Sequence, residues 1–528
     1  MAQVEARTVL WYMTFMGFIV NYMIRINLNI TIVDMIAAKG EVPSNVTLNG
    51  TLANSTALAA LPQLNERFSL ERWFFDWANI PYEKNGFNWN GKQQGNLLGS
   101  FFWAHWTLQI PGGILATKYG TKLVFGWSNG IGVFCCFLIP LVSYWSYTGL
   151  IILRVFQGWV TGLAWPSMHV LTAKWIPPNE RSKFVSAYLG SSVGVALFYP
   201  IFGYIIDWTR WEWVYYVCGV VGTLWFIAWQ FLVFDSPAEH PRIADSERKY
   251  IEKSLGASIQ GTKGPTPWKA IATSRPVWLN VVAQWGGIWG LFTLMTHAPT
   301  YFRLIHHWNI RATGFLSGLP HLMRMLFAYV FSMFADYLLR TDRLSRTNVR
   351  KLATFICCGV KGFIVLALAY FGYNATAAIV LVTLATMFHG AVSSGPLASM
   401  VDLSPNYAGI VLGVSGMIGG MPGFISPFIV GQLTNDNQTI EAWKNVFLLS
   451  SLMLTGSGIL YVLFSESSLQ PWNSVCHPLP ETGLKDLQNL AVDREDEEEK
   501  KPLRADHDDD TQNVAETETK TKSVGDEQ

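Results

Sequence analysis

Long apolar stretches recur along the chain and alternate with shorter polar segments. Each holds about 20 residues or more, enough for a helix that rises about 1.5 Å per residue to cross a hydrocarbon core of about 30 Å. About twelve such stretches occur, at residues 8–36, 94–116, 123–142, 147–171, 183–206, 211–234, 277–301, 313–339, 352–373, 375–401, 406–433 and 442–465. The pattern predicts an all-α polytopic membrane protein with 12 transmembrane helices. The first stretch is too long and too interrupted by polar residues for a signal-peptide core, so we expect it to be retained.

The longest internal polar segment falls between the sixth and seventh stretches and leaves two halves of similar length. This arrangement is typical of a duplicated six-helix unit. We therefore expect an N-terminal six-helix bundle with a glycosylated loop, a cytosolic central loop, a C-terminal six-helix bundle and a disordered acidic cytosolic tail. These parts cover residues 1–234 (with the loop at 37–92), 235–275, 276–466 and 467–528. The helical spacing of Ile243, Tyr250, Ile251 and Leu255 predicts a short surface helix in the central loop.

Two independent patterns predict the same orientation in the membrane. Lys and Arg cluster in the loops after the second, fourth, sixth and eighth stretches, and the positive-inside rule then places these loops and both termini in the cytosol. Asn-x-Ser/Thr sequons fall in odd-numbered loops, and we expect glycosylation at Asn45, Asn49, Asn54 and Asn437. Asn374 lies too near a helix end and Asn29 lies inside the first stretch, so we expect neither to be modified.

Composition supports a membrane protein and argues against other classes. Half of the 528 residues are hydrophobic and 14% are charged, whereas soluble domains carry about 25% charged residues. The six cysteines match neither a disulfide scaffold nor a zinc-ligand spacing, and no nucleotide-binding or hydrolase motif is present. We therefore expect no enzyme activity, cofactor, metal or nucleic-acid partner. From Glu481 onward, 16 acidic and 7 basic residues make a tail too poor in apolar residues to fold.

Ionisable side chains inside the apolar stretches are mostly basic. A charge at bilayer depth is costly unless it faces protein or water, so each one is a candidate functional residue. The candidates for binding a substrate are Arg25, Arg154, Arg324, His105 and His297. Because no glutamate lies near the centre of a stretch, a cavity lined by these groups would attract an anion. Structural alternatives remain open: arginines can pair with carbonyls, Lys361 can extend to the interface, and His321 and His389 are typical of packing residues.

Several segments carry a specific family resemblance. They are "GSFFWAHWTLQIPGGILATKYG" (99–120), "LRVFQGWVTGLAWPS" (153–167), "DSPAEHPRIADSERKYI" (235–251) and "VDLSPNYAGIVLGVSGMIGGMPGFISP" (401–427). The chain resembles solute carrier family 17, the anion:cation symporters of the major facilitator superfamily, over residues 8–473. That family includes the vesicular glutamate transporters, sialin and the type I sodium-dependent phosphate cotransporters, and the likeness is greatest to inorganic phosphate cotransporters. It implies two six-helix bundles that work by alternating access around a central cavity.

The resemblance assigns expected roles to individual residues. The family's "IRxNL" pattern matches residues 24–28 and carries an anion-contacting arginine onto Arg25. Its "RxxQG" pattern matches residues 154–158 and carries a second functional arginine onto Arg154. The gating pattern of the superfamily's cytosolic loops matches Gly113 and Gly120, with Thr117 where an acid is usual, and its second-half copy keeps Asp336.

Departures from the family pattern change the expected substrate and coupling ion. Acid-coupled relatives carry a glutamate seven residues after the second arginine, and this chain has Thr161 there. A family histidine is replaced by Leu98, and the arginine that glutamate transporters carry in the seventh span is replaced by Gly287. In the opposite direction, tyrosine positions hold His105 and His321, and Arg324 stands where the family is usually apolar.

Together these features predict a secondary active transporter that moves an anion, inorganic phosphate or a small organic anion, with a coupling cation by alternating access. Sodium is the favoured coupling ion because threonine cannot titrate. One alternative is proton-coupled transport of an organic or acidic-sugar anion, and another is a membrane sensor or scaffold that keeps the fold without transport. The expected partners are the small anion, the coupling cation and the lipid bilayer, in the plasma membrane rather than a lysosomal or vesicular membrane.

Overall fold

The computed structural model describes residues 5–37, 86–177, 180, 184, 186–259, 266–405, 407–435 and 437–473. The predicted tail lies outside the described residues from Ser474 onward. Most of the loop predicted at 37–92, with Asn45, Asn49 and Asn54, also lies outside them.

The described part of the first half is a series of helices. Their bounds are α1 Ala6–Ala37, α3 Gly91–Ser100, η2 His105–Leu108, α4 Gln109–Tyr119, α5 Thr121–Trp145, α6 Tyr147–Thr161, α7 Ala164–Trp175, η4 Ser186–Leu189, α9 Gly190–Trp208 and α10 Trp211–Leu232. The central segment contains η5 Pro237–Glu239, α11 Asp245–Ile259 and α12 Trp268–Thr273. The short surface helix predicted there is confirmed by α11.

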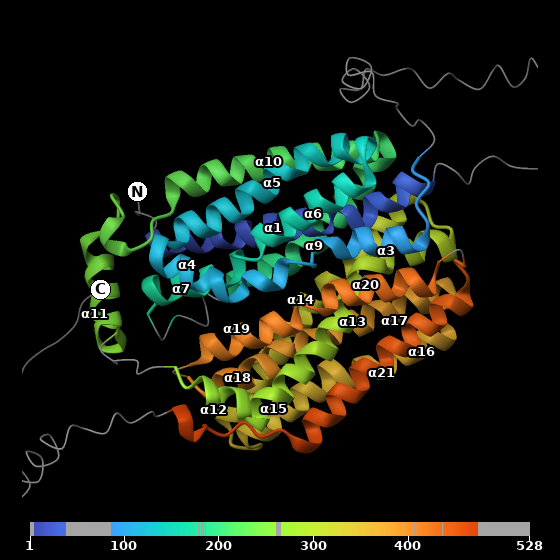
Figure 1. The fold of residues 1–528 in the computed structure, drawn as a ribbon. Helices are drawn as coiled ribbons and strands as arrows, with labels where there is room; N and C mark the ends of the chain where they lie inside the picture. Colours follow the sequence, from blue (N-terminus) through green and yellow to red (C-terminus); the bar gives the residue numbers. More distant parts are fainter. Residues whose placement is uncertain are drawn as a thin grey trace, which may run out of the picture. The chain divides into compact units, whose positions relative to one another are not determined.

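The second half repeats this all-helical pattern. Its elements are α13 Arg275–His306, α14 Ile310–Arg340, α15 Arg346–Thr354, the π-helical η6 Phe355–Val360, α16 Lys361–Phe371, α17 Ala375–Phe388, η7 His389–Ser393, α18 Pro396–Leu403, α19 Ala408–Gly419, α20 Pro422–Leu433, α21 Ile440–Phe464 and η8 Pro471–Asn473. In Figure 1 the blue-to-green helices α1–α10 form one group, and the yellow-green-to-red helices α13–α21 form the other.

Nine helices among the described residues are long and apolar enough to cross a membrane. The other three predicted stretches are helical as well, but they depart from a continuous apolar span. The second stretch is divided into α3, η2 and α4, and the fourth is divided into α6 and α7. The seventh is the unbroken 32-residue α13, which carries polar residues such as Asn280, Gln284 and His297.

The break in the second stretch fits against α6 because two glycines face it. A Cβ on Gly158 would lie 1.7 Å from the carbonyl oxygen of Phe101, and a Cβ on Gly162 would lie 2.4 Å from that of His105. Residues four apart share a helix face, so α6 presents a strip of bare backbone to the irregular segment. This close approach brings His105 and Phe101 to the turn of α6 that carries Arg154.

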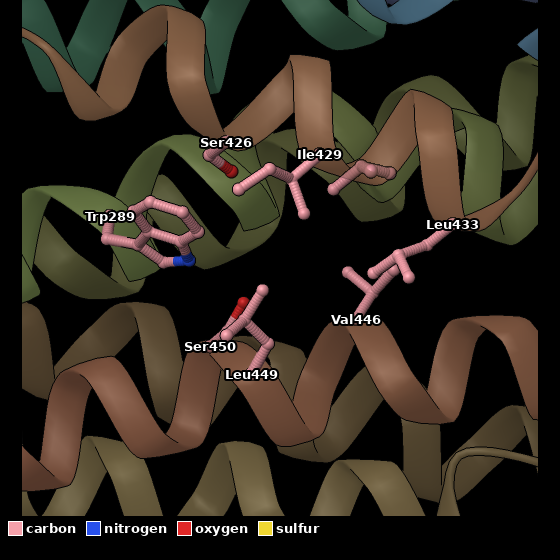
Figure 2. A pocket seen from close by; sticks show the side chains of 8 residues that line it. Trp289, Ser426, Ile429, Leu433, Val446, Leu449 and Ser450 are labelled. Atoms are coloured by element: carbon pink, nitrogen blue, oxygen red, sulfur yellow. The ribbon is translucent and has the colours of Figure 1, made fainter. Parts of the chain in front are cut away.

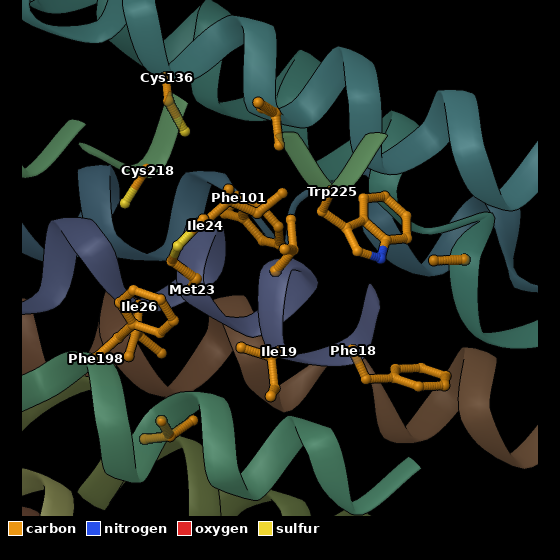
Figure 3. Packing of buried hydrophobic residues seen from close by; sticks show 14 of the residues in the cluster. Phe18, Ile19, Met23, Ile24, Ile26, Phe101, Cys136, Phe198, Cys218 and Trp225 are labelled. Carbon is orange, nitrogen blue, oxygen red and sulfur yellow. The ribbon is translucent and has the colours of Figure 1, made fainter. Parts of the chain in front are cut away.

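A large hydrophobic core surrounds α1, which is buried on most sides. Phe18, Ile24 and Ile26 of this helix pack among residues of α3, α5, α9 and α10, as Figure 3 shows. The fixed position of α1 in this core holds its few polar side chains in place.

The two groups of helices meet at the end that carries the odd-numbered loops. A Cβ on Gly95 of α3 would lie 2.4 Å from a carbonyl oxygen of α20, and a Cβ on Gly314 of α14 would lie 2.5 Å from one of α9. Arg311 of α14 and Asp207 of α9 form an ion pair there. At the opposite end, a Cβ on Gly409 of α19 would have no atom within 4 Å. The structure is therefore closed at the odd-loop end.

Candidate functional site

Arg25 lies in α1 and is only 5% exposed. Its guanidinium carbon is 4.5 Å from the ring centre of Tyr22, 5.5 Å from that of Phe102 and 5.6 Å from that of Phe101. One terminal nitrogen donates to the side-chain oxygen of Asn21 at 3.4 Å, and Nε has no hydrogen-bond partner among the described residues. Aromatic faces and an amide, rather than a carboxylate, therefore surround this charge.

His105 of η2 connects Arg25 to α6. Its Nδ1 donates to the carbonyl oxygen of Gly158 at 2.9 Å, because a carbonyl can only accept. Its Nε2 lies 3.5 Å from a terminal nitrogen of Arg25 and 3.4 Å from the side-chain nitrogen of Gln109, both of which can only donate. The contacts therefore select the neutral imidazole with its proton on Nδ1 and its lone pair toward Arg25.

Arg154 of α6 is only 1% exposed. Its Nη1 donates to the side-chain oxygens of Gln157 at 2.7 Å and Asn27 at 3.3 Å, and to the carbonyl oxygen of Ile24 at 3.3 Å. Within the described ranges of the chain, its Nε has no hydrogen-bond partner. The amides that orient Arg154 are Asn27, two residues after Arg25 in "IRINL", and Gln157, three residues after Arg154 in "RVFQG".

The two arginines share one aromatic ring. The guanidinium carbon of Arg154 lies 5.0 Å from the ring centre of Phe101, and that of Arg25 lies 5.6 Å from it. In the described part of the chain no carboxylate pairs with either arginine. Two permanent charges with unused donors, held in a setting of low polarity, form a site that fits an anion.

Thr161 is fully buried on the same helix, seven residues after Arg154. Its hydroxyl lies 2.9 Å from the carbonyl oxygen of Gln157 and 3.1 Å from that of Gly158, so it donates within its own helix. Its methyl group faces α5, where a Cβ on Gly132 would lie 2.7 Å from it. The side chain that replaces the family's glutamate therefore packs and does not point a polar atom at Arg154.

The other two candidate binding residues lie apart from this pair in their contacts. Arg324 of α14 donates to the hydroxyl of Ser192 on α9 at 2.5 Å and so connects the two halves. His297 of α13 is 4% exposed, and its ring centre lies 6.2 Å from that of Trp443 on α21. Its Nε2 has no hydrogen-bond partner. The structure thus brings together Arg25, Arg154 and His105, whereas Arg324 and His297 have other neighbours.

Of the residues expected to gate the first half, Gly120 has a conformational reason to be glycine. It has φ of +89°, and a Cβ there would lie 2.2 Å from a carboxylate oxygen of Asp235. That carboxylate accepts a hydrogen bond from the backbone N–H of Lys122 at 2.8 Å, which satisfies a donor in the first turn of α5. Gly113 is packed more loosely, since a Cβ there would come only within 3.9 Å of Pro166.

Asp336, the acid expected in the second-half copy of the gate, is exposed on α14. The ion pair of this region is made instead by Asp402 of α18, whose carboxylate lies 2.7 Å from Nε of Arg350 on α15. The pairing of Asp402 with Arg350, 52 positions away, leaves no local signal in the sequence.

The sequence left open whether Lys361 extends to the membrane interface. Lys361 does not extend to the interface: it is fully buried, and its Nζ donates to the carbonyl oxygen of Gly287 at 3.4 Å. It reaches the α13 backbone because Gly287 has no side chain to cover that carbonyl.

An apolar crevice between α13, α20 and α21 is a different kind of space. Figure 2 shows it lined by residues such as Trp289, Ile429 and Val446, with Ser426 and Ser450 as its polar groups. It has no room for a water molecule and holds none of the basic side chains described above. It is therefore a packing defect between helices, not the anion site.

The site residues that charge alone does not reveal are neutral amides. Asn21, Asn27, Gln109 and Gln157 contact the basic side chains directly. Their signal was available, because Asn21 and Gln157 lie four and three positions from the arginines and therefore share a helix face with them.

The fold and the buried basic site can be compared with known proteins. The pattern of the Major Facilitator Superfamily matches residues 10–427. Among solved structures, the partially occluded inward-open xylose transporter XylE from E. coli is similar with a TM-score of 0.58, at 11% identity over 88% of this chain and all of that one. A bacterial homolog of the human lysosomal transporter Spinster, in an inward-facing state, has a TM-score of 0.57 at 13% identity over 89% of this chain and all of that one. The protein is therefore a multi-pass transporter with the major facilitator fold, and not an enzyme.

Relatives at higher identity define the family within this class. Vesicular glutamate transporter 2 of Bos taurus is 33% identical over 473 residues, which cover 88% of this chain and 75% of the relative. Sialin of Homo sapiens is 33% identical over 470 residues, which cover 89% of this chain and 91% of the relative. The chain belongs to solute carrier family 17.

Proposed function

We propose that the protein is a secondary active transporter that moves an anion, inorganic phosphate or a small organic anion, together with a coupling cation by alternating access. The observation that carries this proposal is the arrangement of Arg25 and Arg154 around Phe101, with an unused Nε on each. Burial of two arginines is costly, and a bound anion offsets part of that cost when it accepts their free N–H groups. Gly113, Gly120 and Asp336 would act in gating.

Arg324 and His297 complete the proposed set of substrate-binding residues as contacts made in other states of the cycle. Arg324 bonds across the two halves to Ser192, so opening between α9 and α14 would free its guanidinium. The unpaired Nε2 of His297 offers a second buried polar group on α13, a helix that also packs against α1.

Sodium is the proposed coupling ion. Thr161 cannot exchange a proton, and its hydroxyl is already used within α6. The alternative, proton coupling, would need another titratable group near Arg154, and the neighbouring His105 has its ring nitrogens committed to Gly158 and to the donors of Arg25 and Gln109.

We also propose that both termini face the cytosol and that the protein acts in the plasma membrane. The orientation rests on the basic even-numbered loops, and Asn437 is exposed between α20 and α21, where a glycan would have access. The side chain of Asn374, unlike that of Asn437, is engaged in a helix cap. It caps α17 by accepting from the backbone N–H groups of Thr376 and Ala377.

The test is uptake by the purified full-length protein in liposomes. Radiolabelled phosphate and small carboxylates are offered under an inward sodium gradient, and then under a pH gradient with the membrane voltage held constant. We expect uptake of at least one anion to rise with the sodium gradient and to be lost in Arg154→Gln. Uptake driven by the pH gradient alone would overturn sodium coupling, and no uptake of any anion would overturn the transport proposal.

A further inference from the structure

The second half contains its own buried group of basic side chains. Lys361 is fully buried, and His321 and His389 are each 3% exposed. They come from α14, α16 and η7, three separate elements of the second half. Arg324 and Lys361 lie near enough to act electrostatically on both imidazoles.

Several donors and acceptors in this group have no partner among the residues that the structure describes. The ammonium of Lys361 has three N–H donors, and its hydrogen bond among the described residues goes to Gly287. Nδ1 of His321 and Nδ1 of His389 are buried without a hydrogen-bond partner in the described part of the chain. No carboxylate of the described chain forms an ion pair with Lys361. A buried polar group without a partner is rare in a native fold, so this cluster has the chemistry to bind an anion.

Local backbone geometry holds these side chains together. A Cβ on Gly287 would lie 3.4 Å from a ring carbon of His389 and 3.5 Å from the sulfur of Cys358. A Cβ on Gly390 would lie 2.6 Å from the carbonyl oxygen of Arg324, so η7 packs directly on α14. Lys361 and His389 thus both lie against the turn of α13 at Gly287, which has no side chain.

The cluster lies close along α13 to the point where this helix meets the first half. Phe292 of α13 packs edge to face against Phe102 with ring centres 4.6 Å apart, and Phe102 is one of the rings around Arg25. Phe292 follows Gly287 by five residues, which is about 7.5 Å along the helix axis. The basic groups of the two halves therefore approach the same interface from opposite sides.

We propose that Lys361, flanked by His321 and His389, is a second anion-binding site and that the substrate is an organic dianion, one end held by Arg25 and Arg154 and the other by Lys361. This inference rests on the proposed function, since it needs the first site to bind an anion. A ligand with one charge would use the arginines and leave the ammonium without a partner. The two sites together therefore select for a second negative group.

The experiment compares two probes with the same four-carbon chain, succinate with two carboxylates and butyrate with one. Half-saturating concentrations are measured by ligand-induced thermal stabilisation of the purified full-length protein at pH 7.5. In the unchanged protein we expect succinate to bind about ten-fold more tightly than butyrate. Lys361→Met should weaken succinate about ten-fold and leave butyrate unchanged, and Lys361→Arg should retain the preference.

Lys351→Met is the matched control, because it removes a lysine of α15 ten positions earlier and should change neither probe. Equal binding of the two probes by the unchanged protein overturns the inference without any variant, as does equal weakening of both probes in Lys361→Met. The proposed function fails separately. It fails if succinate, butyrate and inorganic phosphate all leave the unfolding temperature of the unchanged protein where it was, and the Arg154→Gln variant behaves in the same way. If butyrate or phosphate binds in a manner that depends on Arg154 and succinate is not preferred, the proposal of a second site is overturned and the proposed function is not.

Discussion

The imidazole Nε2 of His105 lies 3.5 Å from a terminal nitrogen of Arg25 and faces it with a lone pair. The ring is fixed in that role because its Nδ1 donates to the backbone of α6. A neutral acceptor orients the guanidinium without neutralising it, as a carboxylate would do. The charge of Arg25 is therefore positioned and still available to an anion.

His105→Phe should weaken anion binding about ten-fold, because a hydrogen bond to a charged group contributes about 1.5–3 kcal/mol. Phenylalanine keeps the ring between Phe101 and Phe102 and removes only the acceptor. The measurement is the KM of anion uptake in liposomes. His307→Asn is the control, because it removes an imidazole at an exposed position whose left-handed φ of 53° asparagine tolerates, and it should leave KM unchanged. An unchanged KM in His105→Phe would mean that Arg25 needs no orientation.

Thr161→Val should keep uptake within about two-fold of the unchanged protein. The lost hydroxyl donates only to carbonyl groups of its own helix, an interaction that adds little to helix stability. The measurement is sodium-driven uptake at saturating anion. A loss of ten-fold or more would show that the hydroxyl contacts the anion or the coupling ion during the cycle.

Gly158→Ala should destabilise the protein by about 3 kcal/mol or more, because its Cβ would overlap the carbonyl oxygen of Phe101 at 1.7 Å. Gly456→Ala is the matched control: this glycine lies inside α21, its Cβ would meet nothing within 4 Å, and alanine favours a helix interior by about 0.8–1 kcal/mol. Thermal unfolding in detergent should therefore move in opposite directions in the two variants. A stable Gly158→Ala protein would contradict the close contact between the broken segment and α6.

Gly95→Leu should abolish uptake while anion binding is retained. The added side chain would prevent α3 from closing against α20, where even a Cβ lies 2.4 Å from the carbonyl oxygen of Pro427. A transporter that cannot close one end still binds but cannot complete a cycle. Uptake and ligand-induced thermal stabilisation are measured on the same preparation, and normal uptake would show that this contact is not required for transport.

Hydrophobic patterning predicted the helices well because lipid exposure imposes about 20 apolar residues on each span. It could not predict the breaks at Phe101–Ala104 and between α6 and α7, which depend on tertiary contacts. Gly158 illustrates this: the sequence shows a glycine, and only the structure shows the carbonyl that requires it.

The candidate site was predicted in part for a related reason. Arg25 and Arg154 stand out because a permanent charge in an apolar run is rare. The destination of a long side chain does not follow from its position, so the sequence left open whether Lys361 extends to the interface, and the structure shows it against α13. Pairing between distant segments, as for Asp402 with Arg350, leaves no mark in either segment alone.

The central claim is that Arg25 and Arg154 bind the transported anion together. It is tested most directly by anion uptake into liposomes containing the unchanged protein, Arg25→Gln, Arg154→Gln or the exposed-residue control Arg343→Gln, with folding checked by thermal unfolding. We predict that each of the first two variants loses at least about 100-fold in kcat/KM, equivalent to about 2.7 kcal/mol, while the control is unchanged. Uptake that persists in a folded Arg25→Gln or Arg154→Gln protein would contradict the account.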